Sequence, residues 1–273
     1  MADRQVRAHS RESISFPRKA TVSVQSTAAV NLKKSSPPSS IDSASLAENK
    51  NPEWSAIIHR FVHRDDCVVE LGCTDGQNLR LIAEATGDDG CVIGIESSPD
   101  HIHRLRNTPA LRRIKNLRLY LSRGDSLPIE PDVADVIICQ GLVSPSGSRQ
   151  AVYREMLRVL RPGGVLVVHD IVVHKLLPPE IADSVAAFAS GLAGAIEAES
   201  YRRMLERLDL RDLQLTHCPS TDLLHQLLIP GAAETAAGRQ VAAALNDVRS
   251  ILPNFISVVR IFARKLSPAG YPS

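Results

Sequence analysis

Short apolar runs alternate with amphipathic stretches along most of this chain. Runs that resemble buried strands stand at residues 67–71, 91–96, 117–121, 134–139 and 165–169. Between them, apolar positions recur at helical spacing, most clearly after residue 76 and over residues 149–160. Parallel strands need crossover connections, and helices usually provide them. We therefore predict an α/β fold: a doubly wound, mostly parallel sheet with helices on both faces.

Further segments complete this prediction. Residues 213–217 and 256–263 have strand patterns and bring the sheet to seven strands. A helix over residues 52–61 is expected before the first strand, because Trp54, Ile57, Ile58 and Phe61 share one helical face. Residues 179–208 are expected to form a helical lid or substrate region, and residues 221–252 a helical insertion before the last strand.

The domain boundaries follow from a change in composition near residue 51. Residues 1–50 are rich in serine and basic side chains and contain the turn-forming run 34–40, so they can bury little apolar surface. We expect a disordered leader there, a single domain over residues 51–266, and a short tail over residues 267–273. Because basic residues outnumber acidic ones in the leader, an organellar transit peptide is an alternative.

Composition limits the classes of partner. The 273 residues carry 32 basic and 30 acidic side chains, which is too even a balance to favour nucleic acid or an anionic membrane. No apolar run approaches the ~20 residues that span a bilayer. The five cysteines show no metal-ligand or secreted spacing. We expect a cytoplasmic protein with a small-molecule substrate, no bound metal, and neither a nucleic acid nor a membrane as partner.

A glycine-punctuated turn after the first strand carries the strongest chemical signal. Gly72 and Gly76 stand where the strand turns into a helix, and glycine lets a ligand approach the backbone closely. Glu96 ends the second strand, 20 residues after Gly76, which is close to the separation at which a carboxylate reaches ribose hydroxyls. This arrangement predicts a nucleoside-bearing ligand.

Several segments together resemble the class I S-adenosylmethionine-dependent methyltransferases. The matching segments are Glu70-Leu-Gly-Cys-Thr-Asp-Gly76, Gly94-Ile-Glu96, Arg123-Gly-Asp-Ser-Leu-Pro128 and Leu160-Arg-Pro-Gly-Gly164. The resemblance implies an S-adenosyl-L-methionine cofactor and methyl transfer by in-line displacement. It also implies a set of cofactor-binding residues: Glu70, Gly72, Gly76, Glu96, Asp125, Ser126 and Gln140.

In the second half of the chain, residues 169–180, 191–196 and 201–205 resemble, in the same order, segments of the arsenite methyltransferase-like subgroup. That subgroup places a metalloid-binding cysteine where this chain has Gly191, and Cys218 is the one thiol after residue 139. One thiolate cannot supply the several sulfur ligands that a soft metalloid prefers. We therefore expect an oxygen, nitrogen or carbon acceptor on a small molecule.

His169 and Asp170 are the candidate catalytic residues. They end the fifth strand, at the edge where open α/β sheets bind ligands, and either could act as a general base. A local hydrogen-bonding role for the pair is the alternative.

Two rival functions stay open at this point. A protein could keep this fold and serve as an inactive regulatory or assembly subunit, because fold does not guarantee chemistry. A nicotinamide-dependent dehydrogenase could share the first glycine loop, but the Asp125 segment and the Leu160–Gly164 turn are not expected in it.

Overall fold

A central β-sheet organises the molecule. The computed structural model describes residues 52–140, 148–175, 196–218 and 254–267, together with the backbone of residues 13–15 and 21–23. The strands follow the order β5-β4-β3-β6-β7-β10-β9 across the sheet, and β8 pairs with β7 beside this path. Their bounds are β3 Cys67–Leu71, β4 Cys91–Glu96, β5 Leu117–Leu121, β6 Ala134–Gln140, β7 Leu160–Val173, β8 Ile196–Glu197, β9 Leu210–Cys218 and β10 Ile256–Lys265.

The sheet is mostly parallel, as the alternation of strands and helices predicted. Strands β3 to β7 pair in parallel, whereas β10 is antiparallel to both β7 and β9. The predicted set of strands is confirmed, and the two-residue strand β8 adds to it. Strand β7 is longer than the predicted 165–169. Its pairing with β6 shifts between Leu160 and Val165, which is where the predicted turn at residues 161–164 interrupts it.

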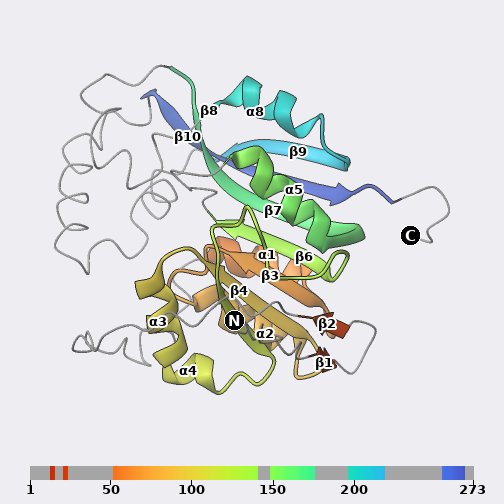
Figure 1. Cartoon of the computed structure of the whole chain (residues 1–273). Helices are drawn as coiled ribbons and strands as arrows, with labels where there is room; N and C mark the ends of the chain where they lie inside the picture. The colour runs from red at the N-terminus through yellow and green to blue at the C-terminus, as the bar shows by residue number, and fades with distance from the viewer. Residues whose placement is uncertain are drawn as a thin grey trace, which may run out of the picture.

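Helices cover both faces of the sheet (Figure 1). The α-helices in the described part of the chain are α1 Pro52–Phe61, α2 Gln77–Thr86, α3 Pro99–Asn107, α4 Pro109–Arg112, α5 Arg149–Val159 and α8 Ala198–Leu205. Helix α3 begins with residue types that favour a helix start: the Ser98 hydroxyl accepts a hydrogen bond from the His101 amide, and proline occupies the first turn. The doubly wound architecture is therefore confirmed.

Two apolar clusters form the core, one on each face. Alternate strand residues point to opposite faces, so Val68 and Val167 pack with α1 and α2, whereas Val69 and Val168 pack with α5 and α8. Trp54 of α1 and Tyr153 of α5 are fully buried at the centres of these layers. This alternation decides which side chains can meet at the functional edge of the sheet.

Parts of the predicted organisation lie outside the described residues. In the leader, β1 Ser13–Ser15 and β2 Thr21–Ser23 pair antiparallel, which the expectation of disorder did not include. The expected insertion at 221–252 is outside the described ranges, and so are residues 179–195 of the expected lid and residues 268–273 of the tail. Residues 196–208 are described and contain β8 and α8. Among the described helices, none combines the length and the hydropathy needed to cross a membrane.

Candidate functional site

The candidate site lies at the carboxyl edge of the parallel strands, where β3, β4 and β6 end side by side. Open α/β sheets bind ligands at this edge. The segment between β3 and α2 turns sharply there, since Gly72 and Gly76 have φ angles of 80° and 77°. Only glycine adopts this left-handed backbone without strain.

Gly72 is required by close packing as well as by its backbone. Its amide donates to the Ile95 carbonyl at 2.9 Å, which ties the turn to β4. A methyl group at its Cα would stand 2.5 Å from the carbonyl oxygen of Gln140. The start of the turn therefore packs closely between the ends of β4 and β6.

Gly76 positions the first turn of α2. It is the N-cap residue of the helix and has no side chain to cap it, but Asp75 Oδ1 accepts a hydrogen bond from the Gln77 amide at 3.0 Å. A β-carbon at Gly76 would lie 2.6 Å from Leu111 and 2.9 Å from Leu105. The next amides of the helix start can be offered to a ligand, because the first amides of a helix have no partner within the helix.

Glu70 presents a buried carboxyl group just below this turn. The side chain is 1% exposed, and its Oε1 accepts a hydrogen bond from Asn78 Nδ2 at 2.8 Å. Its other oxygen, Oε2, is buried without a hydrogen-bond partner in the described structure. Burial raises the pKa of Glu70 to about 8, and the hydrogen bond from Asn78 opposes this only in part. A cationic group beside Glu70 would favour the ionised form.

Glu96 presents a second carboxylate, at the end of β4. Its Oε1 accepts from the amides of Ser97 and Ser98 at 2.8 and 3.0 Å, and His101 Nδ1 lies 3.7 Å away. Burial would raise the pKa of Glu96, but the hydrogen bonds and the nearby imidazole outweigh it and hold the pKa below its ordinary value. Glu96 is therefore a fixed anion at neutral pH.

The segment with Asp125 and Ser126 follows β5, and both residues are exposed. Helix α5 holds the following residues in place. The Leu127 amide donates to Glu155 Oε2 at 2.8 Å, and Arg158 donates to the carbonyls of Leu127 and Ile129. The helix thus fixes the backbone next to the predicted cofactor-binding residues Asp125 and Ser126.

These parts fit an adenosyl sulfonium ligand. Free helix amides, an anchored anion at the end of β4 and a buried carboxyl with one unpartnered oxygen converge on one edge. The model for a family described as "Methyltransferase domain" matches residues 63–209, which is more than half of the chain. The chain belongs to this methyltransferase family. The comparisons below relate it to the class I enzymes that use S-adenosylmethionine, within the arsenite methyltransferase-like group.

Sequence relatives of this methyltransferase support that placement. The chain is 27% identical over 150 residues to an arsenite methyltransferase of Halobacterium salinarum, covering 55% of the chain and 38% of the relative. It is 23% identical over 159 residues to one from Aquipseudomonas alcaligenes, covering 55% and 46%. The chain therefore spans less than half of the length of these relatives.

A solved structure supports the fold. A phosphoethanolamine N-methyltransferase of Haemonchus contortus, in complex with S-adenosylhomocysteine, has a TM-score of 0.65 at 13% identity, covering 79% of this chain and 53% of its own. At this identity the likeness shows the fold alone.

The structure separates the two predicted catalytic residues of the methyltransferase. His169 and Asp170 are consecutive on β7, so their side chains lie on opposite faces of the sheet. His169 packs on Trp54 of α1, with ring centroids 4.3 Å apart, and both residues are fully buried. They therefore cannot work as one pair, and the catalytic role of each is still a prediction.

Asp170 sits in a buried ionic cluster. Its Oδ2 accepts from Arg149 Nε and from the Tyr201 hydroxyl, each at 2.8 Å, and the hydroxyls of Tyr201 and Tyr153 are 2.9 Å apart. Arg149 begins α5 and Tyr201 lies on α8, so Asp170 links both helices to β7. Both carboxylate oxygens of Asp170 accept hydrogen bonds within the fold, and this geometry favours a structural role for Asp170.

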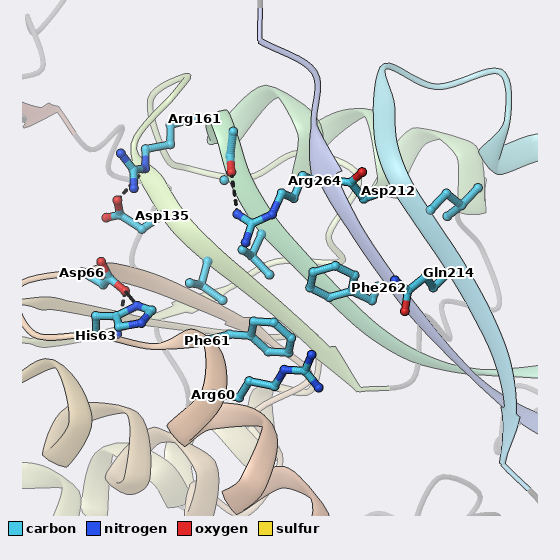
Figure 2. Close-up of a pocket in the computed structure, with 15 residues that line it drawn as sticks. Arg60, Phe61, His63, Asp66, Asp135, Arg161, Asp212, Gln214, Phe262 and Arg264 are labelled. Atoms are coloured by element: carbon cyan, nitrogen blue, oxygen red, sulfur yellow. Dashed lines mark hydrogen bonds and ion pairs between the residues drawn. The ribbon is translucent and has the colours of Figure 1, made fainter. Parts of the chain in front are cut away.

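A cleft of about 880 Å³ lies at the opposite edge of the sheet, near the starts of β6 and β7. Figure 2 shows that Arg161 faces Asp135, that His63 faces Asp66 and that Arg264 reaches a backbone carbonyl. The Arg161 Nε to Asp135 Oδ1 distance is 2.6 Å. The charges in this cleft are largely compensated, and none of the predicted cofactor residues lines it.

Sequence reasoning missed the supporting polar residues. Each of these residues contacts a predicted site residue or the segment that carries one. They are Asn78, Arg149, Glu155, Arg158 and Arg260. They lie on neighbouring elements at large sequence separations, except Asn78, whose position in the first turn of α2 was a readable signal. Over the described ranges, no group of three or more His, Cys, Asp or Glu side chains could hold a metal ion.

Proposed function

We propose that this protein binds S-adenosylmethionine at the carboxyl edge of β3 and β4 and methylates a small-molecule acceptor. The observation that carries the proposal is the placement of Glu96, an anchored anion, beside a turn whose two left-handed glycines expose the start of α2. Carboxylates at this position accept hydrogen bonds from ribose hydroxyls.

Each predicted residue has a distinct task in this proposal. Glu96 holds the ribose, and the exposed pair Asp125 and Ser126 meets the adenine from the β5 side. Glu70 lies near the positively charged end of the cofactor, where its unpartnered oxygen would gain a partner. Gly72 lets the cofactor approach the backbone next to Gln140.

The reaction then depends on positioning more than on covalent participation by the protein. The bound cofactor supplies a methyl group that its sulfonium already activates. The protein aligns the acceptor with that methyl group and excludes water. Gln140, at the end of β6, borders both the cofactor turn and β7, so it can contact either ligand.

An oxygen, nitrogen or carbon nucleophile suits this chain better than arsenite does, although relatives carry the name arsenite methyltransferase. All five cysteines lie within the described residues, and they form no group of three that could share one metalloid. Burial raises the pKa of both Cys73 and Cys139, the thiols nearest the candidate site, so these groups stay protonated.

The test is detection of S-adenosylhomocysteine by mass spectrometry after incubation with S-adenosylmethionine and a panel of small acceptors. The panel contains phenols, carboxylic acids, amines and enolisable ketones. We expect product with at least one class, and a lower yield with Glu96→Gln at the same subsaturating cofactor concentration. Glu84→Gln, on the exposed side of α2, is the matched control and keeps the activity. Cofactor binding without product from any acceptor would instead favour a non-catalytic subunit.

A further inference from the structure

A row of polar side chains crosses the sheet at its carboxyl edge, on the face that α1 covers. Gln140 of β6 pairs in register with His169 of β7, and His169 pairs with Arg260 of β10. Glu53, at the start of α1, forms an ion pair with Arg260 from above. The residues before them on these strands, such as Ile138 and Val167, belong to the apolar cluster of this face, so polar side chains gather at its carboxyl edge.

The contact between Arg260 and His169 fixes the tautomer of the imidazole. Arg260 Nε donates to His169 Nε2 at 3.0 Å. A guanidinium has donors and no acceptor, so Nε2 must offer its lone pair. Burial lowers the pKa of His169 to about 4, so the ring is neutral at neutral pH. Its one proton therefore resides on Nδ1.

This Nδ1–H group has no hydrogen-bond partner among the described residues. The imidazole is fully buried, and the Trp54 ring packs against it. An unsatisfied buried donor destabilises the fold, and such a group is common where a ligand completes the bond. Only β6 separates β7 from β3, so His169 lies about 10 Å across the sheet from the strand that carries Glu70.

We infer that His169 binds the methyl acceptor by donating a hydrogen bond from Nδ1 to an acceptor oxygen, and that it does not act as a general base. This inference rests on the proposed function. It assigns the acceptor to molecules with a carboxylate, carbonyl or hydroxyl oxygen near the methylated atom. An imidazole whose Nε2 lone pair is engaged by Arg260 and whose Nδ1 already carries a proton has no free lone pair for base catalysis.

The indole of Trp54 packs over the proposed binding position beside His169 Nδ1. Because the His169 ring is buried against it, an acceptor oxygen reaches Nδ1 only when the indole moves. Trp54 is the single tryptophan of the chain. Its fluorescence therefore reports occupancy of the position beside His169 without interference from another indole.

The tautomer is measured first, by long-range ¹H–¹⁵N spectra of the protein labelled at histidine. We expect a protonated Nδ1 and an unprotonated Nε2 in the wild type at pH 7. Arg260→Met should release the ring to a mixture of tautomers. Arg264→Met, on the same strand and bonded to the Gly163 carbonyl instead, should leave it unchanged. A proton on Nε2 in the wild type, or a doubly protonated ring at pH 7, overturns the inference.

The donor role is measured second, with acetate as the oxygen probe and methylammonium as the cationic control. We expect acetate to shift the Nδ1–H resonance and the Trp54 emission, and methylammonium to shift neither. His169→Asn keeps a donor near the δ position and should retain the acetate response, whereas His169→Leu should weaken acetate binding at least ~10-fold. A resonance that acetate leaves unmoved contradicts the inference.

These two experiments can fail independently of the test of the proposed function. The tautomer and the acetate response are read in the free protein, without S-adenosylmethionine. A protein that fails to bind the cofactor but shows the expected tautomer and acetate response refutes the proposed function alone. A protein that binds the cofactor but shows an Nε2–H ring refutes the assignment of His169 alone.

Discussion

Asn78 Nδ2 donates a hydrogen bond to Glu70 Oε1 at 2.8 Å and leaves the other oxygen of this buried carboxyl without a partner in the described structure. The carboxyl is therefore costly to ionise in the folded protein. Its pKa is about 8 when folded, against an ordinary value of 4.5. Between these values the folded state binds more protons than the unfolded state, so the free energy of unfolding falls as pH rises.

This relationship predicts a pH-dependent effect of Glu70→Gln. The variant should gain stability relative to the wild type by about 1.4 kcal/mol per pH unit at most across that window, because the amide cannot ionise. Urea unfolding at pH 5, 6, 7 and 8 measures it. Glu84→Gln, with a side chain 58% exposed, is the control and should show no such trend. A difference that stays constant from pH 5 to pH 8 would mean that Glu70 titrates normally.

Gly72→Ala should destabilise the protein more than Gly163→Ala does. Both glycines have positive φ angles, 80° and 76°, so both variants incur the strain of a left-handed alanine, about 1 kcal/mol. A β-carbon at Gly72 also meets the Gln140 carbonyl at 2.5 Å, whereas the nearest atom at Gly163 is 3.6 Å away. Thermal unfolding of the two variants compares them. Equal losses would show that the turn has room beside β6.

Asp170→Asn should cost about 3–5 kcal/mol of stability, because it removes the buried carboxylate that pairs with Arg149. The matched control is Asp132→Asn, which breaks the ion pair to Lys265 at 2.5 Å. Asp132 is 53% exposed, so this loss should stay below about 1 kcal/mol. Chemical denaturation measures both. A small effect at Asp170 would indicate that the cluster does not anchor α5 and α8.

The fold was readable from the sequence because each local signal is strong and agrees with the others. The apolar run at 91–96 became a fully buried strand, and Ser98 and Pro99 begin α3 as their residue types favour. The alternation of apolar and polar residues also predicted which side chains of a strand lie on the same face of the sheet. It could not show that β7 continues past His169, because the extension pairs with the distant strand β10, as in the pairs Asp170–Val259 and Val173–Ile256.

The site was only partly readable. Gly72, Gly76 and Glu96 meet at one edge as their spacing predicted, since all three depend on a short strand, turn and helix unit. The environment of His169 and Asp170 was not predictable, because it is set by Arg260 and Arg149 from distant segments. Adjacent strand residues face opposite ways. This rule alone predicts from the sequence that the side chains of His169 and Asp170 lie on opposite faces of the sheet.

The central claim is that Glu96 holds the ribose of S-adenosylmethionine at the end of β4. Titration calorimetry of the wild type, Glu96→Gln and the control Glu84→Gln with S-adenosylmethionine tests it most directly. We predict saturable binding with one ligand per chain for the wild type and the control. The Glu96 variant should bind about 5- to 150-fold more weakly, the equivalent of about 1–3 kcal/mol. No binding by the wild type, or equal affinity of the Glu96 variant, would contradict the claim.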